Sequence, residues 1–150
     1  MAATGRLQIL IVHGMLSSMA VISRTVATLR IIGDDLDPYE VSRLLGIEPT
    51  AQARKGEPSR SGYPAQQGIW RLSATEQAPG DLNRQIDELL AKVTSDPSVW
   101  AHLTQKFRCD IFCGLFMQDG NEGEQLEPAT LAMLGSRGLQ LGLDIYGAGD

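Results

Sequence analysis

Apolar and polar residues alternate in several stretches of the chain, a period of two that is typical of β-strands with one buried face. The alternation is clearest over residues 27–32 and 139–146, and residues 108–117 carry small or apolar side chains at every second position. A shorter stretch, 69–73, is centred on a tryptophan, and residues 51–55 resemble a minor edge strand. The pattern therefore predicts four main strands and one minor one.

Runs of apolar residues spaced three or four apart predict helices between these strands. The first helix begins after Asp37, which can cap the free backbone amides, and ends at Gly46. The second follows Asp81, a further helical piece restarts after Asp96, and the last opens at Pro128. All are short, so we expect them to depend on packing against the sheet.

The resulting element order is β-α-β-α-β-α-β. The first and last main strands alternate apolar with polar residues, so the sheet is expected to carry helices on one face only. We therefore predict an α+β fold in which helices pack on one face of a four- to five-stranded, largely antiparallel sheet. This pattern disfavours a doubly wound parallel sheet.

The first 20 residues differ from the rest of the chain. Their apolar run, 7–12, is short for the hydrophobic region of a signal peptide, and His13-Gly14 interrupts it. We interpret residues 1–20 as a non-core N-terminal extension, in which 7–12 would form an extra strand if ordered. Residues 21–150 are interpreted as a single α+β domain. No apolar run approaches about 18 residues, so we expect a cytoplasmic protein with no membrane partner.

Charge narrows the classes of partner. The 150 residues carry 13 basic and 18 acidic side chains, a net charge of −5, which disfavours a nucleic-acid-binding protein. The charge is uneven, because residues 1–75 hold eight basic and six acidic side chains, whereas residues 76–150 hold five and twelve. Two faces of opposite sign could select charged partners, although solvated loops would give the same composition.

One segment, 54–71, is basic and rich in glycine, with Glu57 as its single acidic residue. Such a loop can hold a phosphate or an acidic segment of a partner, although it lacks the order of residues found in a P-loop. The alternative is a solvated loop whose glycines turn the chain. The candidate binding residues are Arg54, Lys55, Gly56, Arg60, Trp70 and Arg71.

The remaining titratable groups do not form a catalytic set. Cys109 and Cys113 share one strand face about 13 Å apart, too far for a disulfide, and are interpreted as buried small hydrophobes in a reduced protein. The acidic cluster at 34–37 is explained better by helix capping than by a hard cation. His102 is the one general-base candidate within the domain. We therefore predict no catalytic residue, no metal and no cofactor.

Aromatic residues supply a further candidate surface. Phe112 and Phe116 lie on the strand face opposite the cysteines, and Tyr146 faces away from the leucines of its own strand. Together with Ile32 they could form an apolar patch on the uncovered face of the sheet, a mark of a dimer or partner surface. The alternative is that a loop or the N-terminal segment covers them.

Several strings resemble a family of bacterial domains of unknown function, the one numbered 4279. They are Gly33-Asp34-Asp35-Leu36-Asp37-Pro38, Leu45-Gly46-Ile47-Glu48-Pro49-Thr50, Lys55-Gly56, Gly68-Ile69-Trp70 and the strand Leu143-Asp144-Ile145-Tyr146. The likeness spans residues 25–147. It implies a small bacterial cytoplasmic α+β domain with no assigned activity, and it brings no catalytic residues.

Two functional hypotheses remain open. The first is a non-enzymatic binding domain that recognises a protein partner through its charged faces, as immunity proteins do. The second is a regulatory domain that binds a small molecule or anion through the basic loop 54–71. A homo-oligomer is compatible with either.

Overall fold

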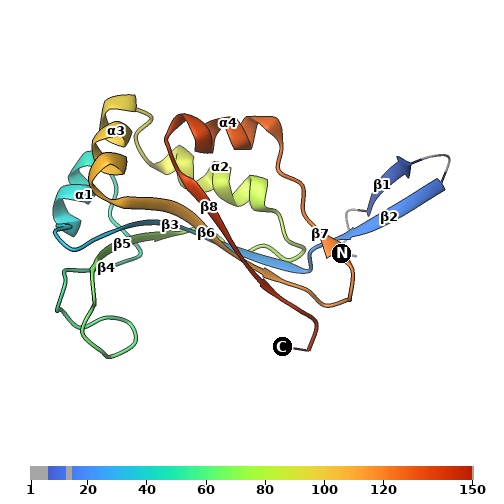
Figure 1. Cartoon of the computed structure of the whole chain (residues 1–150), viewed down its shortest axis with the longest axis horizontal. Coiled ribbons are helices and arrows are strands. Elements are labelled where there is room, and N and C mark those ends of the chain that lie inside the picture. The colour runs from blue at the N-terminus through green and yellow to red at the C-terminus, as the bar shows by residue number, and fades with distance from the viewer. Residues whose placement is uncertain (1–6, 13–14, 150) are drawn as a thin grey trace.

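The computed structural model describes residues 7–12 and 15–149, and its centre is a five-stranded sheet (Figure 1). The strand order is β4-β5-β3-β6-β8, and neighbours are antiparallel except for the parallel pair β6 and β8. The strands are β3 (Arg24–Gly33), β4 (Ala51–Ala53), β5 (Gly68–Ser73), β6 (Arg108–Phe116) and β8 (Gln140–Tyr146).

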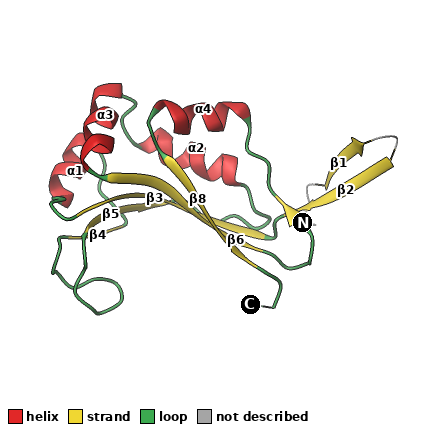
Figure 2. Ribbon diagram, in the orientation of Figure 1, coloured by secondary structure: helices red, strands yellow, loops and turns green. Residues whose placement is uncertain are grey.

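Four helices cover one face of this sheet and leave the other face open (Figure 2). They are α1 (Pro38–Leu45), α2 (Leu82–Lys92), α3 (Pro97–Lys106) and α4 (Pro128–Ser136). The predicted α+β class, the largely antiparallel sheet and the one-sided helix layer are confirmed.

The helix starts follow the local signals in the sequence. The Asp37 side chain accepts a hydrogen bond from the Tyr39 backbone amide, and Asp81 and Asp96 cap α2 and α3 in the same way. Gly46 ends α1 with a φ of 79°, a left-handed conformation that glycine adopts without strain.

The core lies between the sheet and the helices. Every second residue of β3 and β6 points into it, and the two tryptophans, Trp70 and Trp100, are almost completely buried there. Polar side chains are buried there as well, among them Gln85 of α2. Its amide nitrogen donates to the Thr25 carbonyl at 2.9 Å and its amide oxygen accepts from the Thr25 hydroxyl at 2.7 Å. This buried network fixes α2 over β3.

The N-terminal strands belong to a separate small sheet. Strands β1 (Leu7–Val12) and β2 (Met15–Val21) pair antiparallel as a hairpin that projects from one end of the domain (Figure 1). Residues 7–12 are thus a strand, whereas His13 lies outside the described residues. The last two residues of β2 pair in parallel with β7 (Glu122–Gly123), a two-residue strand in the connection between β6 and α4.

The described part of the chain contains no helix with the length and apolarity that crossing a membrane would require.

Candidate functional site

The open face of the sheet carries a group of arginines on three adjacent strands. Arg30 of β3 lies directly opposite Arg71 of β5, and Ile32 lies opposite Arg108 of β6, so all of these residues point to the same face. The loop between β4 and β5 extends on this side, away from the helices (Figure 1), and adds Arg60.

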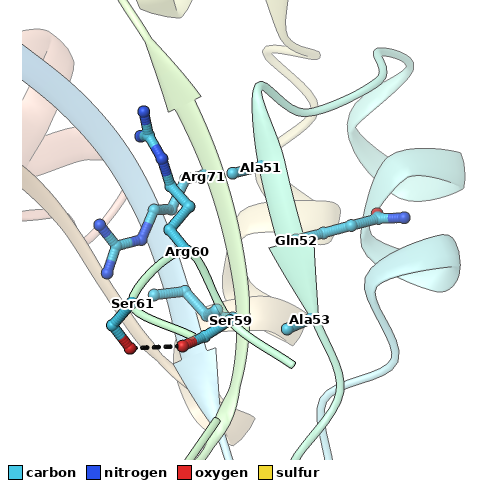
Figure 3. A pocket seen from close by; sticks show the side chains of 8 residues that line it. Ala51, Gln52, Ala53, Ser59, Arg60, Ser61 and Arg71 are labelled. Carbon is cyan, nitrogen blue, oxygen red and sulfur yellow. Dashed lines mark hydrogen bonds between the residues drawn. The ribbon is translucent and has the colours of Figure 1, made fainter. Parts of the chain in front are cut away.

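Two adjoining hollows lie between this loop and the sheet. The smaller, about 270 Å³, is shown in Figure 3, where Arg60 and Arg71 extend on the same side of β5 and Gln52 points away from them. The larger, about 480 Å³, extends over β3 and includes Arg30 and Arg108. We call the two together the arginine hollow, and both are lined by Ser59, Ser61, Ile69 and Arg71.

The loop that covers the hollow is held by its own hydrogen bonds. Its backbone pairs across the loop, with Gly56 N–H donating to the Ala65 carbonyl and Ala65 N–H donating to the Glu57 carbonyl, both at 2.8 Å. At its tip the Ser59 hydroxyl donates to the Tyr63 carbonyl at 2.7 Å. Its shape is therefore defined before any ligand binds.

The charge of Arg30 is neutralised within the sheet. Its guanidinium donates two hydrogen bonds to the Asp110 carboxylate, at 2.8 and 2.7 Å, and lies 4.2 Å from the centre of the Phe112 ring. The two side chains are only 17% and 8% exposed. This bidentate pair joins β3 to β6 on the open face.

The other arginines of the hollow have no such counter-charge. Among the residues that the structure describes, no carboxylate lies within ion-pair distance of Arg60, Arg71 or Arg108. Burial lowers the pKa of Arg71 from its usual value, and the neighbouring positive charges of Arg30 and Arg60 lower it further, whereas Asp110 has a smaller effect in the opposite direction. The hollow therefore carries an excess of positive charge in an otherwise acidic protein.

The first basic residues of the predicted loop pair with carboxylates outside the arginine hollow. Arg54 binds Asp37 at 3.0 Å and lies over the Tyr39 ring, while the Lys55 ammonium lies 3.5 Å from the Asp34 carboxylate. Gly56 turns the chain with a φ of 87°. These residues tie the loop to the start of α1, where acidic side chains already gather, so their charges are paired rather than presented in the hollow.

Trp70 is placed differently from the sequence prediction, which grouped it with the binding residues. It is 0% exposed, faces the helices, and donates from its indole nitrogen to the Ser42 hydroxyl at 3.0 Å. Side chains alternate along a strand, so Trp70 must face opposite to Ile69 and Arg71. It cannot contact a ligand in the arginine hollow, and the same alternation was visible in the sequence.

Sequence reasoning missed Arg30, Arg108, Ser59 and Ser61 as parts of this site. Arg30 and Arg108 come from strands that precede and follow the loop by many residues, and only the strand register brings them beside Arg71. Nothing in the sequence around Ser59 and Ser61 distinguishes them from ordinary polar residues of a loop.

The predicted aromatic patch is present only in part, because Ile32 is 8% exposed and cations cover some of the aromatic rings. Phe116 and Tyr146 stack with ring centres 4.7 Å apart, and the Arg24 guanidinium lies 3.6 Å from the centre of the Phe116 ring. Since Arg30 covers Phe112 in the same way, the open face is amphipathic rather than simply apolar.

The other candidate groups are accounted for by local structure. Asp34 accepts a hydrogen bond from Gln67 and pairs with Lys55, and Asp37 caps α1, so this cluster serves the helix start and the loop. Within residues 7–12 and 15–149 no set of three metal-binding side chains comes together. His102 is exposed on α3.

The two cysteines offer a direct test of the packed sheet. Both are buried and unpaired, and burial, with a smaller effect of Asp110, raises the pKa of each thiol to about 12. Because the thiolate is the reactive form, about one thiol in ten thousand would be ionised at pH 8. We expect no measurable reaction of Cys109 and Cys113 with a thiol-specific chromogenic disulfide in the native protein, and full reaction of both in guanidinium chloride. Rapid labelling of the native protein would contradict the buried placement.

Comparison with known proteins locates the chain within one family. No curated protein and no solved structure matches it. A family model described as a domain of unknown function, DUF4279, matches residues 23–148. That match includes the whole five-stranded sheet, the helices α1 to α4 and the arginine hollow, and it begins after the N-terminal hairpin. The chain therefore belongs to the DUF4279 family of domains of unknown function.

Proposed function

We propose that this domain is a non-catalytic binding module whose ligand is a small, multiply charged anion held in the arginine hollow. The observation that carries the proposal is the convergence of Arg60, Arg71 and Arg108 on one hollow with no carboxylate partner among the described residues. Such a group of like charges attracts a ligand of opposite sign.

The lining of the hollow suits such a ligand. Guanidinium groups bind phosphate and carboxylate oxygens through paired N–H donors. The Ser59 and Ser61 hydroxyls, which hydrogen-bond to each other at 2.8 Å, add polar surface at the same place. The neutral Arg30–Asp110 pair forms one wall. A volume of a few hundred cubic ångströms corresponds to a metabolite, so the ligand class is a phosphorylated or polycarboxylate small molecule.

Recognition of a protein partner by opposite charged faces receives less support. Two carboxylates of the acidic segment 110–127 are used internally: Asp110 pairs with Arg30, and Glu122 accepts hydrogen bonds from Ser23 and from the backbone of Gln118. We therefore favour the basic hollow over an acidic face as the functional surface. The net charge of −5 also argues against nucleic acid as the anion.

A bacterial cytoplasmic setting is part of the same proposal. Two buried cysteines without a disulfide suit a reducing compartment, and a pool of phosphorylated metabolites is found there.

Thermal unfolding in the presence of pyrophosphate tests the proposal. A ligand that binds only the folded state stabilises it, by about 2.7 kcal/mol at one hundred times its Kd, which corresponds to several degrees in Tm for a chain of this size. We expect pyrophosphate to raise the Tm of the protein by several degrees over chloride at equal ionic strength, and Arg71→Gln to abolish that shift.

Arg84→Gln is the matched control, because it removes the same charge from an exposed position on α2. This variant should keep the full shift. Equal loss in both variants would indicate nonspecific charge effects, and no shift with pyrophosphate, citrate or sugar phosphates in the unsubstituted protein would contradict the proposal.

A further inference from the structure

The sheet has two edges of different kinds. At one edge β4 has three residues and lies beside the arginine hollow. At the other edge β8 has seven residues, pairs with β6 on one side, and has no strand on its outer side in the described part of the chain. An edge of this length presents a row of unpaired backbone groups, which is a template for another strand.

The backbone groups that point outward can be identified. The Tyr146 carbonyl accepts a hydrogen bond from the Met117 amide at 3.0 Å, so the backbone of Tyr146 points toward β6. Backbone direction alternates along a strand, and therefore Leu141, Leu143 and Ile145 direct their N–H and C=O groups outward. Two of these side chains are also unusually exposed for their type, Leu143 at 50% and Ile145 at 59%.

The surface beside this edge is apolar as well. Helix α4, which packs against β8, contains no charged residue, and its Leu131 is 51% exposed. The single charge on β8, Asp144, points to the opposite face and accepts a hydrogen bond from the Tyr146 hydroxyl at 2.6 Å. β8 also lacks the lysine, proline or bulge that commonly protects an exposed edge.

We propose that β8 pairs antiparallel with β8 of a second copy of this chain, on a two-fold axis at Leu143, so that the two five-stranded sheets become one continuous sheet. In this register Leu143 lies opposite Leu143 of the second copy, and Leu141 lies opposite its Ile145. Three outward-facing residues per strand then supply about six backbone hydrogen bonds across the junction.

The sequence of β8 is self-complementary in this register. The helix side of the junction becomes a ladder of leucine and isoleucine, and on the open side Asp144 lies opposite Gly142 while Gln140 lies opposite Tyr146. Centring the axis on Asp144 instead would place two carboxylates opposite each other, which is destabilising. Centring on Leu141 or Ile145 would leave much of each strand unpaired.

Charge does not prevent a second copy from occupying this edge. Two molecules of net charge −5 repel each other, so an interface between them needs few acidic side chains. Helix α4 has no charged residue, and the single carboxylate of β8, Asp144, lies opposite Gly142 of the second copy rather than opposite another charge.

Sedimentation analysis over a range of protein concentrations tests the oligomeric state. We expect a dimer at tens of micromolar and a monomer for Leu143→Lys, because that change opposes two ammonium groups on the axis at an exposed position that tolerates a long side chain. Ala101→Lys adds the same charge on the exposed side of α3 and should stay dimeric.

Cysteine cross-linking tests the register. In a hydrogen-bonded antiparallel pair the facing Cα atoms are about 5.5 Å apart, within the range for a disulfide, so Leu143→Cys should cross-link two copies under mild oxidation. Ile145→Cys is the matched control, because the two copies of residue 145 would lie about 13 Å apart and should not cross-link. The native thiols are buried and should not interfere.

Support for the proposal is a dimer that Leu143→Lys disrupts and Leu143→Cys captures. A monomer at all concentrations would overturn it and leave the edge to a different partner. A dimer that survives Leu143→Lys, or one that Ile145→Cys captures and Leu143→Cys does not, would overturn it as well, because the interface or the register would lie elsewhere.

Discussion

Trp70→Ala should lower the free energy of unfolding by about 4 kcal/mol, the largest effect we expect from a single substitution in this domain. Trp70 is 0% exposed and fills the space between β5 and α1. Its removal leaves a cavity and an unpaired Ser42 hydroxyl in the core. Guanidinium unfolding followed by far-ultraviolet circular dichroism measures the loss, at one fixed protein concentration because oligomer formation would affect stability.

Two further variants separate the contributions of packing and of the hydrogen bond to this loss of stability. Trp70→Phe keeps most of the packing but loses the hydrogen bond to Ser42, so it should cost about 1–2 kcal/mol. Tyr63→Ala, at an aromatic residue that is 75% exposed in the loop, should change stability by less than about 0.5 kcal/mol. If Trp70→Ala were as mild as Tyr63→Ala, the buried placement of Trp70 would be contradicted.

Asp110→Asn should be the second most damaging change, costing about 3 kcal/mol. The substitution keeps the shape of the side chain but leaves the largely buried Arg30 guanidinium without its counter-charge. Breaking one half of a buried pair is costly because the remaining charge has lost its contact with water. Glu76→Gln is the control, because its partnership with Arg24 is exposed and should contribute less than about 1 kcal/mol.

The same variant connects stability with the proposed function. With Asp110 neutral, Arg30 adds its positive charge to those of Arg60, Arg71 and Arg108, so pyrophosphate should stabilise Asp110→Asn more than it stabilises the unsubstituted protein. If Asp110→Asn were less stable but gained nothing from pyrophosphate, the anion would have to bind away from Arg30. A loss no larger than that of Glu76→Gln would contradict the buried pair itself.

The two proposed surfaces lie at opposite edges of one sheet. The arginine hollow begins at β4, β5 and the loop between them and extends over β3 to Arg108 at the start of β6, whereas the dimer edge is the outer side of β8. A dimer through β8 would therefore place the two hollows at its outer ends, open to solvent. Either proposal can fail without affecting the other.

Several parts of the fold could be predicted from the sequence because they depend on local chemistry. Asp37, Asp81 and Asp96 each cap a helix with their own carboxylate, and Gly46 ends α1 with its left-handed backbone. The alternation in β6 placed Cys109 and Cys113 on the buried face. The alternation of apolar and polar residues along the strands, which gives each strand one apolar face, also predicted that helices would cover one face of the sheet only.

The candidate site could be predicted only in part. Basic side chains in 54–71 were found from composition, yet composition could not separate Arg54 and Lys55, which pair with acidic residues near α1, from Arg60 and Arg71, which line the hollow. That division depends on how the loop folds back. Gln85 was missed for a similar reason, since a polar residue on an apolar helix gives no sign that it will meet Thr25.

By itself the sequence determined the element order, the helix caps and the buried faces of the strands. Each of these features depends on residues that lie close together in the sequence. Only the tertiary structure decided which strands are neighbours. That choice placed Arg30, Arg71 and Arg108 on one open face and left β8 at an edge. Strand pairing joins residues as far apart as Arg30 and Asp110, so it depends on the packing of the whole core, and no local pattern carries that information.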